Sequence, residues 1–176
     1  MMKLSTAVRI LTAGVLIVLA GSAAAQRAYP NKPIRIIVTV APGGSVDYLA
    51  RLVGQKLTES WGQQVIVDNR PGGNTVIGSE ALVKSPPDGY TILSMSNTIV
   101  IIPLLLSTPY DPIKDFAPVA PIARSEFVLV IHPSVPANNL QQFIVLAKSK
   151  PGQLNFGSSG TGGSIHLAAE LFNVMV

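Results

Sequence analysis

The sequence contains no cysteine, and this absence excludes several kinds of structure and chemistry. The chain cannot form disulfides, bind a metal through thiolates or use a cysteine as a nucleophile. It also has no cysteine that could carry a lipid and tether an exported protein to a membrane. Any binding or chemistry therefore depends on other side chains or on the backbone.

Histidine is almost as scarce, since His132 and His166 are the only two in the chain. A metal site without cysteine needs several histidines or paired carboxylates at ligand spacing, and the sequence has no such set. The net charge is only +4, and the basic residues do not form a run. We therefore expect no metal, no other cofactor and no nucleic-acid partner.

Residues 1–25 have the pattern of a secretory signal peptide. Lys3 and Arg9 precede an apolar run that is shorter than the roughly 20 residues a membrane-spanning helix needs. Ala23 and Ala25 are the small residues that signal peptidase prefers. We expect cleavage after Ala25 and a mature protein that is free in a bacterial periplasm; an N-terminal membrane anchor is the less favoured alternative.

Strand and helix patterns alternate along the rest of the chain. Continuous β-branched runs indicate buried strands, and apolar residues at helical spacing indicate amphipathic helices. The order βαβαβ at the start is typical of a parallel α/β sheet with helices on its faces. The expected strands are 34–40, 64–68, 90–96, 127–133 and 153–159; the expected helices are 45–61, 74–85, 140–150 and 164–176; and 97–106, with Pro103, is ambiguous.

Two loops have the same form. APGGSVD (41–47) and GSSGTGGS (157–164) each follow an expected strand, are rich in small residues and open a helix. In an open α/β sheet such loops lie beyond the carboxyl ends of the strands, where ligands bind. Unpaired N–H groups and the helix dipole there attract an anion or a polarised carbonyl. The pair of loops predicts a binding cleft.

Asp47 lies in the first turn of the helix that follows the first loop, and two compatible interpretations remain open. It stabilises the positive end of the helix, or it accepts a hydrogen bond from a ligand or from a water that bridges to one.

A dinucleotide site is poorly supported. The first loop lacks the G-x-G-x-x-G spacing, and no lysine follows the glycines as in a P-loop. Asp68 stands where a ribose-binding carboxylate would stand, but aspartate is also common at solvated strand ends.

A hydrolase site is also poorly supported, and we expect no catalytic residue. The segment GSSG places Ser159 directly before Gly160, so the G-x-S-x-G spacing fails. His166 has no evident orienting partner in the sequence. An exported enzyme that uses Ser158 or Ser159 remains the alternative from another class, and a fragment without a function of its own is a third possibility.

Five segments, taken in order, resemble the substrate-binding proteins of tripartite tricarboxylate transporters, the Bug receptor family of bacterial periplasms. They are YPNKPIRIIVTVAPGGSVDYLAR (29–51), VIVDNRPGGNTVIGSEAL (65–82), PPDGYTIL (86–93), PYDPIKDFAPV (109–119) and NFGSSGTGGSIHLAAELF (155–172). The resemblance implies a periplasmic binding protein of type II, in which two Rossmann-like lobes enclose a small carboxylic acid. The sequence departs from the family's pattern at Val40, where the family often has an aromatic residue, and near Asn74 and Thr75.

The resemblance also implies the ligand-binding residues and the partners. The residues are Pro42, Gly43, Gly44 and Asp47 in the first loop, Asn97 and Thr98 after the third strand, and Ser158, Ser159, Gly160, Thr161 and His166 around the second loop. The implied partners are a small carboxylate and the membrane components of the transporter, and the full-length protein is expected to be a monomer. Which carboxylate it binds stays open.

The expected domain organisation follows from the resemblance and from the pattern of prolines. Residues 26–107 form the first lobe, 108–122 cross between the lobes, and 123–176 begin the second lobe. The last helix lacks the glycine or basic residue that commonly marks a helix end. We interpret the sequence as cut short within the second lobe.

Overall fold

A computed structural model describes residues 29–176, so the signal peptide expected over residues 1–25 lies outside the described residues. A parallel three-stranded sheet in the order β2-β1-β3 forms the centre of the first part of the chain. Its strands are β1 (Ile34–Val38), β2 (Val65–Asn69) and β3 (Thr91–Ser94). The parallel βαβαβ order predicted from the sequence is confirmed.

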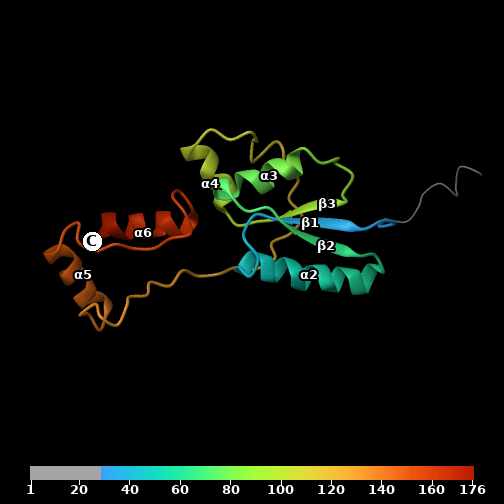
Figure 1. The fold of residues 1–176 in the computed structure, drawn as a ribbon. Helices are drawn as coiled ribbons and strands as arrows, with labels where there is room; N and C mark the ends of the chain where they lie inside the picture. Colours follow the sequence, from blue (N-terminus) through green and yellow to red (C-terminus); the bar gives the residue numbers. More distant parts are fainter. Residues whose placement is uncertain (1–28) are drawn as a thin grey trace, which may run out of the picture.

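Strand β1 is the centre of this sheet and the most buried part of the chain. Ile36 pairs with Val67 on one side and with Ile92 on the other. Ile37 and Val38 are fully buried, with no exposed area. The continuous β-branched run has this environment because helices cover both faces of the sheet, as Figure 1 shows.

Helix α2 (Ser45–Trp61) covers one face of the sheet, where Ala50 packs against Ile36 and Val38. It ends at Gly62, whose left-handed backbone (φ 65) lets its N–H donate to the Thr58 carbonyl at 3.0 Å. The helix therefore begins and ends close to the residues expected from its apolar spacing.

The opposite face carries η1 (Gly73–Thr75), α3 (Val76–Val83) and α4 (Thr98–Leu105). The helix predicted over 74–85 begins later than expected because Asn74 and Thr75 have positive φ angles of 50 and 79. A right-handed helix cannot start through residues in that conformation. The ambiguous segment 97–106 is a helix.

Pro103 lies inside α4, and the chain compensates for the hydrogen bond that this proline cannot make. Proline has no N–H to donate to the carbonyl four residues earlier, which is that of Ile99. The hydroxyl of Tyr110, a residue only 6% exposed, donates to this carbonyl at 3.3 Å. Tyr110 also meets Phe116 edge to face at 5.5 Å. The segment after α4 therefore folds back onto the helix.

The prediction of strands over 127–133 and 153–159 is wrong. Both segments are irregular and exposed, with Val128 at 79% and Val130 at 80%. A strand is held by hydrogen bonds to a neighbouring strand. Within residues 29–176, no backbone hydrogen bond joins either segment to another strand. These β-forming residues therefore have no neighbouring strand with which to pair.

Two helices make up the rest of the described chain, α5 (Leu140–Ser149) and α6 (Ser164–Met175). They lie side by side, on the side of the sheet where its strands end (Figure 1), and Phe143 stacks on Phe172 at 6.2 Å. None of the helices in the described range is long and apolar enough to cross a membrane. The division into residues 26–107, 108–122 and 123–176 stays a prediction.

Candidate functional site

The first loop connects β1 to α2 and points bare backbone toward solvent. Pro42 and Gly43 are exposed, and Gly44 is the N-cap of α2. Gly43 has a φ of +89, which side chains other than glycine rarely adopt. No hydrogen bond in the described structure occupies the N–H groups of Ser45 and Val46. These donors, at the positive end of a helix, form a place where an anion can bind.

Asp47 lies behind this loop and is only 3% exposed. Its Oδ2 accepts from the Gly43 N–H at 2.9 Å and from Arg51 Nε at 3.0 Å. Its Oδ1 accepts from Asn69 Nδ2 at 2.8 Å and lies 3.0 Å from Arg51 Nη2. The Arg51 hydrogen bond, then those of Gly43 and Asn69, lower the pKa of Asp47 to about 2. The carboxylate is ionised, and protein groups occupy both of its oxygens.

This geometry supports the first of the two interpretations of Asp47, in which it stabilises the start of α2. A carboxylate has about four acceptor positions, and four donors of this chain surround the one on Asp47. Its oxygens therefore offer little to a ligand. A negative charge in the first turn also interacts favourably with the helix dipole.

Arg51 and Asn69 belong to this arrangement, and neither was among the site residues expected from the sequence. Asn69 Nδ2 also donates to the Val40 carbonyl at 3.1 Å, and Arg51 Nη2 donates to Asn69 Oδ1 at 2.9 Å. The spacing of Asp47 and Arg51, four residues apart on one helix, is a signal that could have indicated their pairing. The contact of Asn69 depends on β2 lying beside β1, which no local pattern encodes.

The segment after β3 contributes one accessible residue and one buried one. Asn97 is exposed at the N-cap of α4. Thr98 is 6% exposed, and its hydroxyl accepts from Ser96 Oγ at 3.1 Å. Of the two predicted ligand contacts, Asn97 is thus the one that solvent reaches.

The second loop precedes α6. Ser158, Ser159 and Thr161 are exposed, and Ser158 Oγ accepts from the Gly160 N–H at 3.4 Å. His166 is half-buried, and its Nδ1 lies 3.4 Å from the Gly162 N–H, which donates to it. This hydrogen bond joins the loop to the first turn of α6.

This loop contacts the sheet-bearing part of the chain through η1 and α4. The Asn74 side-chain amide donates to the Thr161 carbonyl. A Cβ on Gly160 would lie 2.7 Å from Asn74 Oδ1, and one on Gly162 would lie 3.2 Å from Leu105 Cδ1. The glycines permit this close approach, on the side where the strands end (Figure 1).

No hydrogen bond among residues 29–176 joins this second loop to residues 41–47. That the two loops face each other across a ligand stays a prediction.

The described residues do not bring together the groups that the hydrolase alternative requires. His166 does have a carboxylate beside it that the sequence pattern did not indicate, since its Nε2 lies 3.7 Å from Glu170 Oε1. In the described chain, neither Ser158 nor Ser159 hydrogen-bonds to His166. The Asp68 carboxylate lies 3.1 Å from Arg70 and 3.7 Å from Arg35. Across residues 29–176 there is no cluster of three or more His, Asp or Glu side chains that could hold a metal.

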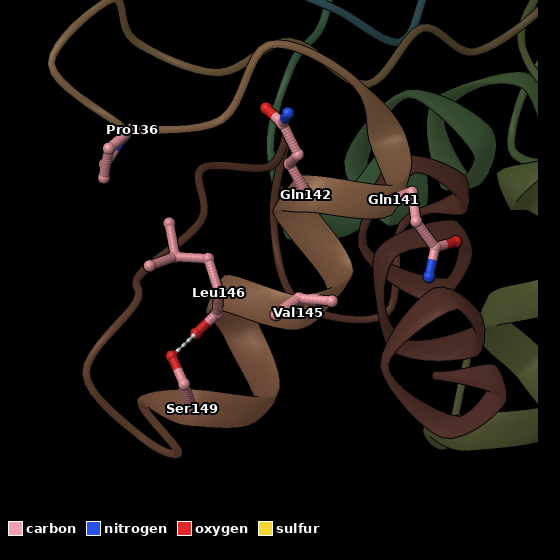
Figure 2. A pocket seen from close by; sticks show the side chains of 6 residues that line it. All are labelled: Pro136, Gln141, Gln142, Val145, Leu146 and Ser149. Carbon is pink, nitrogen blue, oxygen red and sulfur yellow. Dashed lines mark hydrogen bonds between the residues drawn. The ribbon is translucent and has the colours of Figure 1, made fainter.

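A surface hollow of about 370 Å³ lies along α5, and none of its lining residues belongs to either loop; Figure 2 shows the lining. The hydroxyl of Ser149 donates to the Leu146 carbonyl at 2.8 Å, so its proton is used within the helix. The remaining lining groups are aliphatic side chains and two glutamine amides, none of them charged. The lining of the hollow therefore offers no positive charge to pair with a carboxylate.

Comparison with known families identifies the chain. Residues 49–176 match the model of the tripartite tricarboxylate transporter family receptor, which is nearly three quarters of the sequence. The chain belongs to this receptor family. The resemblance found in the sequence is confirmed.

Relatives and solved structures agree with this family. The protein BugT of Bordetella pertussis is 39% identical over 166 residues, covering 92% of this chain and 51% of BugT. A solved periplasmic transporter is 39% identical with a TM-score of 0.71, covering 84% of this chain and 50% of its own. A solved structure of R. palustris Rpa4515 with adipate is 35% identical with a TM-score of 0.79, at the same coverage of both chains.

These matches show that the receptor family's α/β fold is present here, as the sequence predicted. The chain spans about half the length of the curated relatives it matches. The loops described above thus belong to the portion that this chain shares with those relatives.

Proposed function

We propose that this chain is the ligand-binding part of an extracytoplasmic receptor that captures a small carboxylic acid for a tripartite tricarboxylate-type uptake system. The observation that carries the proposal is the start of α2, where the Ser45 and Val46 N–H groups are unoccupied beside a carboxylate whose own charge is balanced by Arg51. Membership of the receptor family supports it.

The electrostatics of the first loop favour an anionic ligand. The partial positive charge at a helix N-terminus favours a carboxylate there, and bare backbone N–H groups are its natural donors. Asp47 does not oppose this, because Arg51 pairs with both of its oxygens. A ligand carboxylate at the loop therefore meets donors rather than a free negative charge.

A dicarboxylate is the ligand class with the most direct support. The R. palustris relative carries adipate, and its structure aligns with 84% of this chain. The periplasm is the proposed location, because the first 25 residues have the pattern of a signal peptide and a solved relative is a periplasmic transporter.

The test is an NMR titration of the ¹⁵N-labelled chain with adipate, with adipamide as the uncharged analogue of the same shape. We expect the amide signals of Ser45 and Val46 to shift with adipate and saturate in the millimolar range, while adipamide leaves them in place. A millimolar range is expected because binding at one loop alone lacks the second set of donors that a closed cleft presents.

Two substitutions of one glycine serve as a matched series. A Cβ on Gly44 would lie 3.3 Å from Val40 Cγ2, so Gly44→Ala requires the half-buried Val40 side chain to shift by only a few tenths of an ångström, whereas the longer side chain of Gly44→Leu covers the loop. We expect Gly44→Leu to abolish the shifts and Gly44→Ala to retain them. Equal shifts with adipamide, or unchanged shifts in Gly44→Leu, would contradict the proposed site.

A further inference from the structure

We infer that Arg51 and Asn69 are positioning residues, which act through Asp47 to hold the first loop in the shape that leaves the Ser45 and Val46 N–H groups open. We call Asp47, Arg51 and Asn69 the loop clasp. The effect of the clasp on ligand affinity rests on the proposed function, whereas its effect on the loop can be measured without any ligand.

The clasp grips the loop at two points. At the start of the loop, Asn69 Nδ2 donates to the Val40 carbonyl at 3.1 Å. In the middle, the Gly43 N–H donates to Asp47 Oδ2 at 2.9 Å. Asn69 and Asp47 are themselves joined at 2.8 Å, so both points are fixed to one unit. The exposed residue Pro42 lies between these two points and is positioned by them.

Arg51 completes the unit and balances its charge. Its Nε donates to Asp47 Oδ2 at 3.0 Å, and its Nη2 donates to Asn69 Oδ1 at 2.9 Å while lying 3.0 Å from Asp47 Oδ1. The planar guanidinium presents its N–H groups from separate nitrogens in a fixed geometry that matches Asp47 and Asn69 together, whereas an ammonium donates from a single nitrogen. Without it, a nearly buried carboxylate would stand unpaired beside the donors proposed for an anion.

Asn69 uses both polar atoms of its side chain in the clasp. The amide nitrogen donates to Val40 and to Asp47, and the amide oxygen accepts from Arg51. An aspartate at this position has no donor and adds a second negative charge next to Asp47. Asparagine therefore suits this position because its side chain both donates and accepts.

The ligand-free test measures the exchange of the Gly43 amide proton and the pKa of the Asp47 carboxyl by NMR in the intact chain. In Arg51→Met we expect Gly43 exchange to accelerate by about tenfold or more and the Asp47 pKa to rise toward its ordinary value of 3.8. Exchange of the Ile36 and Ile37 amides in the central strand should not change.

Lys56→Met is the matched control, because it removes one basic side chain from the same helix, where Lys56 pairs with Glu59 at 2.7 Å. The control should leave both readouts as in the wild type. Arg51→Lys keeps the positive charge but not the planar guanidinium. We therefore expect an Asp47 pKa between those of the wild type and Arg51→Met, and Gly43 exchange faster than in the wild type. This variant also provides the test should Arg51→Met not fold. Readouts in the Arg51 variants that match Lys56→Met would overturn the clasp.

Adipate separates the clasp from the proposed function. Where the wild type shows adipate shifts at Ser45 and Val46, Arg51→Met and Asn69→Asp should weaken them by about tenfold or more, and Lys56→Met should not. Where the wild type shows no shifts but Gly43 exchange still responds to Arg51→Met, the clasp is supported and only the proposed function fails. Unchanged adipate affinity in Arg51→Met alongside altered Gly43 exchange would overturn the role of the clasp in binding.

Discussion

At the scale of single residues, the first turn of α2 shows how one carboxylate can be placed beside an anion site without excluding the anion. Asp47 carries a full negative charge, yet every neighbour that contacts its oxygens is a donor of this chain. A charge paired in this way contributes little field at the adjacent N–H groups. The loop can therefore have both an internal anchor and open donors.

The pKa of Asp47 predicts a specific dependence of stability on pH. Its folded value is about 2 against an ordinary 3.8, so the ionised form is favoured by folding. Its contribution to the free energy of unfolding is complete above about pH 5 and is lost progressively as the pH falls through 3.8 and then about 2. In urea unfolding across this range, the difference in stability between wild type and Asp47→Asn should shrink toward low pH. A difference that stays constant from about pH 7 to about pH 2 would contradict the assigned pairing.

The two glycines of the first loop should respond differently to alanine. Gly43 has a φ of +89 and open space around its missing Cβ, so alanine there suffers only backbone strain, worth roughly 1–2 kcal/mol. Gly44 has a φ of −73, which alanine adopts freely. Urea denaturation should therefore show a clear loss of stability for Gly43→Ala and a small change for Gly44→Ala. Equal losses would mean that the loop relaxes away from the described conformation.

Part of this site could be predicted from the sequence. The glycine-rich loop, the helix after it and the place of Asp47 in its first turn follow from local patterns. The part that Asn69 plays does not, because it depends on strand pairing between residues far apart in the chain. The orientation of Asp47 toward Gly43 and Asn69 is a tertiary outcome as well.

At the scale of elements, α4 offers a direct test of how a helix tolerates an internal proline. The Tyr110 hydroxyl supplies the hydrogen bond that Pro103 withholds from the Ile99 carbonyl. Tyr110→Phe should destabilise the chain by roughly 1–3 kcal/mol, since it leaves a buried carbonyl unpaired. In a Pro103→Ala background the helix N–H of residue 103 can bond to Ile99, so the same change should cost less. A double-mutant cycle by urea denaturation measures this coupling, and additive losses would contradict it.

The elements predicted correctly are those whose partners lie nearby in the described fold. Strand β1 and helix α2 are joined by the first loop and pack on each other directly, so their local patterns agree with their tertiary setting.

The two predicted strands that did not form, 127–133 and 153–159, have suitable composition but no neighbouring strand in the described fold. Strand formation depends on pairing more than on composition. The late start of α3 has another cause, because the positive φ angles of Asn74 and Thr75 are not encoded by helix propensity.

At the scale of the whole molecule, the second loop is attached to the rest of the chain through close approach of backbone. Gly162 has a φ of +81, and a Cβ there would meet Leu105 Cδ1 at 3.2 Å. Gly152 has a similar φ of +72 but open space around it, so it is a matched control. We expect Gly162→Ala to weaken the nuclear Overhauser contacts between this loop and the Leu105 methyls, and Gly152→Ala to leave them intact. Equal contacts in both variants would show that α4 does not hold the loop.

The irregular segment 116–132 exposes several apolar side chains to solvent. Val119, Val128 and Val130 are 86%, 79% and 80% exposed, and no backbone hydrogen bond within residues 29–176 involves residues 127–131. Exposed apolar side chains on an unpaired, β-forming backbone are a template for pairing with another chain. Val174 is equally exposed, at 84%, but its backbone lies in helix α6.

We therefore expect the purified chain to associate reversibly as its concentration rises, with residues 127–131 pairing between two copies. The double variant Val128→Lys/Val130→Lys should shift the association to higher concentration by about tenfold or more, because it adds like charges to both sides of the pairing. Val174→Lys, at similar exposure, should have little effect, because the backbone there is already committed to the helix. Sedimentation velocity at several concentrations distinguishes the two. A wild-type chain that remains monomeric, or equal effects of both changes, would show that backbone pairing at residues 127–131 does not govern association.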